Sequence, residues 1–114
     1  MNFFTDNKDI LFNLKNMDLR KVAELKEKSY EDAKVNGIGY APENYEDAVD
    51  NYNKILSVMG EICGEFIALR AAGVDEEGAH FDNGVVTYAK GTQENLKRLK
   101  QAGLLGLTIP RKWG

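Results

Sequence analysis

The side chains that could carry redox, metal or nucleophilic chemistry are few and stand apart in this sequence. Cys63 is the only cysteine and His80 the only histidine, so the chain can form no internal disulfide and these two residues alone build no Cys/His metal cage. Cys63 sits among Met59, Ile62, Phe66 and Ile67 with no cation nearby, which predicts a small buried hydrophobe rather than a reactive thiol. His80 stands in a turn-rich segment without a second ligand, which predicts a loop histidine.

An acidic run, Asp75 to Glu77, invites a calcium-loop interpretation. The spacing of such a loop fails, because Ala79 stands where the third side-chain ligand should be and no glutamate closes the loop. The sequence also lacks a nucleophile elbow, a glycine-rich phosphate loop after a strand, and an acid and base that spacing alone would pair. We therefore assign no catalytic, cofactor-binding or metal-binding residue from these patterns.

Composition limits the classes of partner. Fifteen basic and eighteen acidic residues give a net charge of −3 without a basic stripe, which argues against nucleic-acid binding. No apolar run approaches the roughly 18 residues of a membrane span, and the first residues mix in acidic side chains where a signal peptide would be basic. We expect a single domain, residues 1–114, in the cytoplasm.

The elements that must position any site are helices. Apolar periodicity predicts a short helix over residues 7–16, capped by Thr5 or Asp6, and a second from an Asp18 N-cap to Ala33. The longest helix is predicted from residue 43 or 44 to about residue 72. The expected fold is all-α, an orthogonal or irregular helical bundle with a small loop or hairpin near residues 75–88.

Glycines and caps refine this prediction. Gly60 and Gly64 lie four apart inside the longest helix and predict close approach of a neighbouring helix. Asp82-Asn83-Gly84 predicts a tight turn, because Asn-Gly tolerates positive φ at both central positions. Thr92 is the expected N-cap of a last helix that carries Leu96, Leu99 and Ala102 and stops at Gly103.

An apolar strip follows that last helix. Such a contiguous patch usually lies against other protein, so we expect a packing role for it and further protein beyond Gly114. The packing residues are predicted to be Leu104, Leu105, Leu107, Ile109, Pro110, Trp113 and Gly114.

Residues 73–87 (GVDEEGAHFDNGVVT), Gly91 and residues 102–114 (AGLLGLTIPRKWG) resemble the N-terminal helical domain of acyl-CoA dehydrogenases. In that family a helix ends in an Ala-Gly-Leu/Trp-x-Gly-Leu strip that runs into Pro-x-x-x-Gly-Gly, which Pro110 and Gly114 match. The loop of residues 75–86 and the opening residues 4–14 resemble the long-form subgroup with extra N- and C-terminal segments. Lys90 departs from the proline that this subgroup usually carries.

The resemblance implies a flavoenzyme that oxidises an acyl-CoA thioester to the 2-enoyl-CoA and passes electrons to electron-transfer flavoprotein. Family members are expected to be homo-oligomers that hold FAD between a middle β-domain and a C-terminal helical domain, which also supplies the catalytic glutamate. Residues 1–114 would then bind no FAD, would be inert alone, and would cover the acyl-chain side of the pocket while the strip packs against the β-domain. The alternative hypothesis is a stand-alone helical protein-interaction module.

Overall fold

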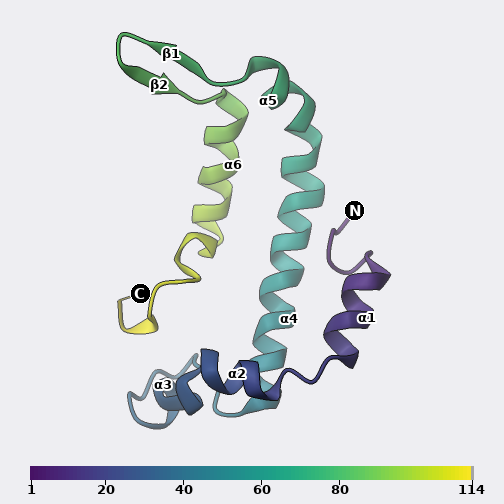
Figure 1. Ribbon diagram of the computed structural model, residues 1–114, viewed down its shortest axis with the longest axis vertical. Helices are drawn as coiled ribbons and strands as arrows, with labels where there is room; N and C mark the ends of the chain where they lie inside the picture. Colours follow the sequence, from purple (N-terminus) through teal and green to yellow (C-terminus); the bar gives the residue numbers. More distant parts are fainter. Residues whose placement is uncertain (114) are drawn as a thin grey trace.

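Two helical arms lie side by side and are joined at one end in the computed structural model, which describes residues 1–113 (Figure 1). The first arm is α4 (Tyr45–Glu61), which runs on into α5 (Ala71–Glu77), and the second arm is α6 (Lys90–Gln101). A hairpin of β1 (His80–Asp82) and β2 (Val85–Thr87) projects where the arms join. Helix accounts for 65% and strand for 5% of the structure, so the fold is mostly helical, as expected.

The first helix, α1 (Lys8–Asn16), starts one residue later than predicted and uses a different cap. The side chain of Asn7 accepts hydrogen bonds from the backbone N–H groups of Asp9 and Ile10, each at 3.1 Å. The predicted capping by Thr5 or Asp6 is wrong, because the Asp6 carboxylate instead accepts the backbone N–H of Asn2 at 2.8 Å.

The second predicted helix is broken in two. It forms α2 (Arg20–Lys26) and a single turn, α3 (Glu31–Lys34), and the intervening residues 28–30 have positive φ angles of 47°, 56° and 64°. The N-cap position is Leu19 rather than the predicted Asp18, although the Asp18 carboxylate accepts the backbone N–H of Arg20 at 3.1 Å. The prediction of one helix reaching Ala33 is therefore wrong.

The longest helical segment begins as predicted and continues further. The side chain of Asn44 caps α4 by accepting the backbone N–H of Asp47 at 2.9 Å. After Glu61 the backbone passes through a π-helical segment, Ile62–Ile67, and a 3₁₀ turn, Ala68–Arg70, before α5. The helical path therefore ends at Gly78, with φ of 65°, rather than near residue 72.

The two glycines of this arm face the N-terminal segment of the chain. A Cβ on Gly60 would lie 2.6 Å from the backbone nitrogen of Phe4, and one on Gly64 would collide with the carbonyl oxygen of Met1. The backbone N–H of Phe3 donates to the carbonyl of Gly60 at 3.0 Å. Close approach is confirmed, but the neighbour is the N-terminal segment, whose residues 3–6 form turns, and not the helix that we expected.

The hairpin matches its prediction. Phe81 pairs with Val86 in an antiparallel register, and Asn83 and Gly84 have φ angles of 48° and 80°. Positive φ at both central residues is the geometry that Asn-Gly favours in a two-residue turn.

The last helix, α6, is capped by a side chain from the other arm. The carboxylate of Glu77 accepts the backbone N–H of Lys90 at 3.0 Å. Thr92 lies inside the first turn, with its N–H donating to the carbonyl of Ala89, so its prediction as N-cap is wrong. The helix stops at Gly103, with φ of 73°, as predicted.

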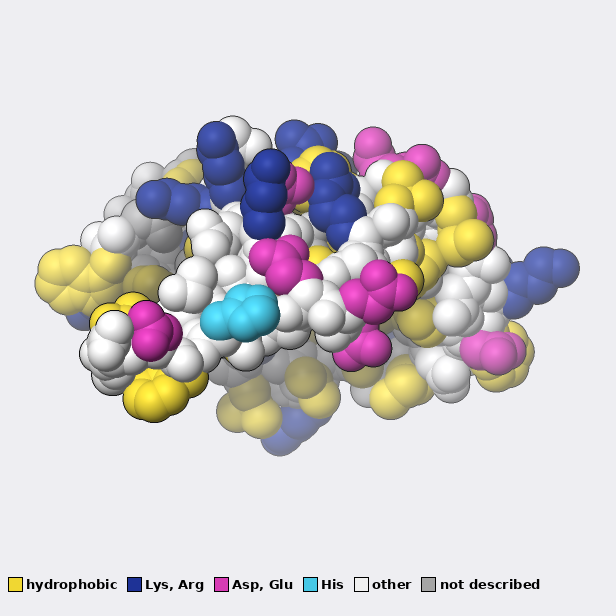
Figure 2. All heavy atoms as spheres, turned by 90° about the horizontal axis from the view of Figure 1, so that it is seen from above, with side chains coloured by type: hydrophobic (Ala, Val, Ile, Leu, Met, Phe, Trp, Pro, Cys, Tyr) yellow, Lys and Arg dark blue, Asp and Glu magenta, His cyan; other side chains and the backbone are white. Residues whose placement is uncertain are grey.

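The interior is small for a chain of this length. The buried apolar residues are Phe4, Ala23, Ala41, Ala48, Ile62 and Ala89, and no large side chain is fully buried among the described residues. The radius of gyration is 17.6 Å, whereas a compact domain of this size has about 13 Å. Hydrophobic side chains accordingly lie exposed over the face in Figure 2.

Candidate functional site

The predicted packing strip lies on the surface after α6. Its side chains are exposed by 53% at Leu105, 41% at Leu107, 52% at Ile109 and 73% at Trp113. Leu104 is half-buried and Pro110 is exposed, while Gly114 lies outside the described residues. The strip is therefore free to contact other protein, although its role in packing against another domain stays a prediction.

The structure as a whole exposes more surface than a compact monomer of its size. The accessible surface of the structure is 8492 Å², whereas a compact monomer of 12.8 kDa exposes about 6,300 Å². The excess, about 2,200 Å², exceeds the roughly 800 Å² that each partner contributes to a standard protein interface. The architecture thus has enough unpaired surface for an extensive interface.

A buried polar network anchors the far end of the strip. Glu27, 3% exposed, accepts the hydroxyl of Tyr52 on one carboxylate oxygen at 2.7 Å and the Arg111 guanidinium on the other at 2.6 Å. The same Arg111 nitrogen lies 3.4 Å from the carboxylate of Asp32. These contacts join α2, α3 and α4 to residue 111, which is 84 positions away from Glu27 in the sequence.

The protonation states of this network are fixed. Burial alone would raise the pKa of Glu27, but the hydrogen bonds from Arg111 and Tyr52 outweigh it and the pKa is lowered. Burial and then the hydrogen bond to Glu27 raise the pKa of Tyr52 well above its usual range. The hydrogen bond to Glu27 also raises the pKa of Arg111. A charged carboxylate and a neutral phenol at neutral pH suit a structural anchor better than a general acid or base.

The sequence patterns did not identify this network. Arg111 occupies one of the variable positions between Pro110 and Gly114, and Tyr52 lies within the longest helix with no motif around it. One signal was available: Glu27 follows Ala23 by four residues, and Ala23 is 1% exposed. Residues four apart share a helix face, so a glutamate there must meet a partner when that face is buried.

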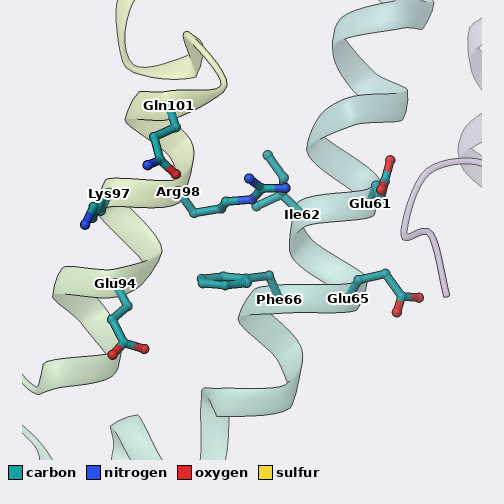
Figure 3. Close-up of a pocket in the computed structure, with 8 residues that line it drawn as sticks. All are labelled: Glu61, Ile62, Glu65, Phe66, Glu94, Lys97, Arg98 and Gln101. Carbon is teal, nitrogen blue, oxygen red and sulfur yellow. The ribbon is translucent and has the colours of Figure 1, made fainter.

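A groove lies between the arms where α6 faces the π-helical segment (Figure 3). It has a volume of about 420 Å³ and is open to solvent. Phe66 and Arg98 extend into the space between the arms, whereas Glu61 and Glu65 point away from it. Its lining residues are Glu61, Ile62, Glu65, Phe66, Glu94, Lys97, Arg98 and Gln101.

Arg70 ties the two sides of this groove together. Its guanidinium lies 3.6 Å from the centroid of the Phe66 ring, donates to the Phe66 carbonyl at 2.7 Å, and pairs with Glu94 of α6 at 3.2 Å. A cation stacked on a ring and paired with a carboxylate fixes the spacing of the arms. Arg70 therefore links the π-helical segment to α6 beside the groove.

Cys63, His80 and the acidic run of residues 75–77 take no part in the polar network around Glu27. Cys63 is half-buried rather than buried. His80 lies exposed in β1 rather than in a loop, and the acidic run lies at the exposed end of α5. Among residues 1–113, no three His, Cys, Asp or Glu side chains are arranged to hold a metal ion.

Within that same range, no helix has both the length and the apolar character of a membrane span. The chain was also compared with known proteins, and no protein-family model, curated protein or solved structure matches it.

Proposed function

We propose that this chain is the N-terminal helical domain of an FAD-dependent acyl-CoA dehydrogenase of the long-form subgroup. The observation that carries the proposal is the exposed strip, residues 104–113, at the edge of a scaffold with about 2,200 Å² of excess surface. The residues that form this strip are those that resemble the family's Ala-Gly-Leu-x-Gly-Leu and Pro-x-x-x-Gly motifs. An interface and a family resemblance thus fall on the same segment.

In this proposal the role of the domain is structural. The strip packs against the β-domain, and the arms cover the acyl-chain side of the substrate pocket and exclude water, which strengthens the interactions that acidify the substrate α-proton. The α4 and α6 arms become part of an orthogonal or irregular helical bundle once further elements cover the groove between them. The expected compartment is the cytoplasm.

In this proposal FAD binds outside residues 1–114. The polar side chains that the fold brings together, Glu27, Tyr52 and Arg111, are bonded to each other. By the family resemblance, FAD lies between the β-domain and the C-terminal helical domain, and the catalytic glutamate belongs to the C-terminal helical domain. The acyl-CoA substrate, electron-transfer flavoprotein and a homo-oligomeric partner would contact the complete enzyme.

The experiment is performed on the natural gene product, captured from a lysate with an antibody raised against residues 1–114. We expect a yellow protein whose flavin absorbance is bleached anaerobically by an acyl-CoA and is unchanged by free coenzyme A. A colourless protein that has full-length mass, or a flavin that no acyl-CoA reduces, would contradict the proposal. A product of about the mass of this chain, 12.8 kDa, would support the stand-alone interaction module.

A further inference from the structure

Three consecutive residues between α2 and α3 have left-handed backbone conformations. Lys28, Ser29 and Tyr30 have φ angles of 47°, 56° and 64°, and none of them is glycine. Residues with a Cβ adopt this region rarely and usually singly, because the Cβ crowds the following carbonyl oxygen. Such a conformation persists only where surrounding contacts hold it in place.

The local sequence does not favour this turn. Residues 28–30 contain no glycine or asparagine, the residues that adopt positive φ most readily, and Ser29 is their only usual turn former. Apolar periodicity predicts one right-handed helix through them to Ala33. Two conformations therefore compete in this segment: a continuous helix that local preference favours and a broken helix that tertiary contacts select.

Two carboxylates on either side of the turn converge on one guanidinium. Glu27 and Asp32 lie 2.6 Å and 3.4 Å from the same nitrogen of Arg111. In a continuous helix, side chains five residues apart point about 140° away from each other around the axis. One arginine could not then bridge both carboxylates in this way, so the bridge and the left-handed turn require each other.

We propose that Arg111 holds the Lys28–Tyr30 turn in its left-handed form, and that residues 20–34 straighten into one continuous helix when Arg111 leaves. The coupling is reciprocal, as any linkage between two equilibria must be. Movement of the strip thereby changes the backbone conformation of residues 20–34, at the end of the molecule that carries α2 and α3. This inference goes beyond the proposed enzyme domain and does not depend on it, because every contact involved lies within residues 27–111.

The first test compares Arg111→Met with Lys100→Met in the 114-residue chain. Lys100 is exposed and forms no ion pair among the described residues, so it controls for loss of a nearby positive charge. We expect Cα chemical shifts of residues 28–30 to become right-handed helical in Arg111→Met only. Left-handed shifts that persist in a folded Arg111→Met variant would overturn the proposal.

The second test leaves the ion pairs intact and also applies if Arg111→Met fails to fold. Ser29 is exposed, and its side chain makes no hydrogen bond among the described residues, so Ser29→Gly relieves left-handed strain whereas Ser29→Ala does not. The readout is hydrogen exchange at the N–H groups of Ile109 and Trp113, which bond to the Gly106 and Pro110 carbonyls.

In the proposal the left-handed turn and the Arg111 bridge stabilise each other. A substitution that makes the turn easier to form should therefore hold Arg111, and with it the strip, in place for more of the time. We expect these two amides to exchange about fivefold more slowly in Ser29→Gly than in Ser29→Ala, after correction for global stability measured by urea unfolding. Equal exchange rates in the two variants would show that the turn and the strip are uncoupled and would overturn the proposal.

Discussion

Tyr52→Phe tests the buried network with the smallest change of shape. The substitution removes only the hydroxyl that donates to Glu27 at 2.7 Å, and so leaves one oxygen of a carboxylate that is 3% exposed without its partner. Hydrogen bonds to charged groups contribute about 1.5–3 kcal/mol, so we expect the free energy of unfolding to fall by about 2 kcal/mol.

The assay is urea unfolding of the 114-residue chain at neutral pH, followed by circular dichroism. With a slope of about 1–3 kcal/mol per molar urea, the midpoint should fall by about 1 M. Tyr45→Phe is the matched control, because Tyr45 lies on the same helix, is also half-buried, and its hydroxyl makes no hydrogen bond among the described residues. Its expected effect is within about 0.5 kcal/mol.

A difference of less than about 0.5 kcal/mol between the two tyrosine variants would refute the reasoning. It would mean that water or another donor replaces the Tyr52 hydroxyl as a hydrogen-bond partner of Glu27 at no cost. The network would then not anchor residue 111 to α4.

Three further predictions follow from other contacts. The pKa of Glu27 is lowered in the folded chain from its ordinary value of 4.5, so its contribution is complete above the unfolded pKa and is lost as pH falls through the folded one. Glu27→Gln should therefore flatten the fall in stability on the acid side of pH 4.5, and an unchanged pH profile would count against this. Gly64→Ala should lower the free energy of unfolding by about 1–3 kcal/mol, because the new Cβ meets the Met1 carbonyl. The control is Gly73→Ala, which has open space around it and should raise the free energy of unfolding by up to about 1 kcal/mol. Equal unfolding midpoints for the two variants would contradict the close contact between Gly64 and the N-terminal segment. The isolated chain should bind a hydrophobic dye and self-associate, and Leu105→Ser with Trp113→Ser should reduce both in fluorescence and light-scattering measurements, whereas unchanged values would exclude the strip as the adhesive surface.

The parts of the fold that depend on local chemistry were predictable from the sequence. The hairpin turn follows from Asn83-Gly84, whose φ angles of 48° and 80° are those that this dipeptide favours. The start of α4 follows from an asparagine three residues before an aspartate, and the end of α6 follows from Gly103.

The parts that depend on distant contacts were not predictable. The break at residues 28–30 contradicts local helical preference, and the residues on either side of it contact Arg111, which lies about eighty residues further along the chain. The N-terminal segment against Gly60 and Gly64 shows the same limit, since a close approach was predictable from the glycines but the identity of the neighbour was not. Likewise, Glu77 caps α6 from across the hairpin, which sequence spacing does not reveal.

The candidate site also has one part that was predictable from the sequence and one part that was not. The strip was visible as a run of apolar residues between glycines, and its exposure at Leu105, Ile109 and Trp113 is a property of composition and position. The network beneath it consists of residue types that are common on surfaces. Only the fold makes Glu27 a buried carboxylate, and only then does Arg111 become distinguishable from its neighbour Lys112.

The measurement that tests the central proposal most directly is the intact mass of the natural gene product, determined by mass spectrometry after capture with an antibody against residues 1–114. The acyl-CoA dehydrogenase proposal predicts a polypeptide several times heavier than 12.8 kDa that co-purifies with FAD. A polypeptide of about 12.8 kDa without flavin would contradict it.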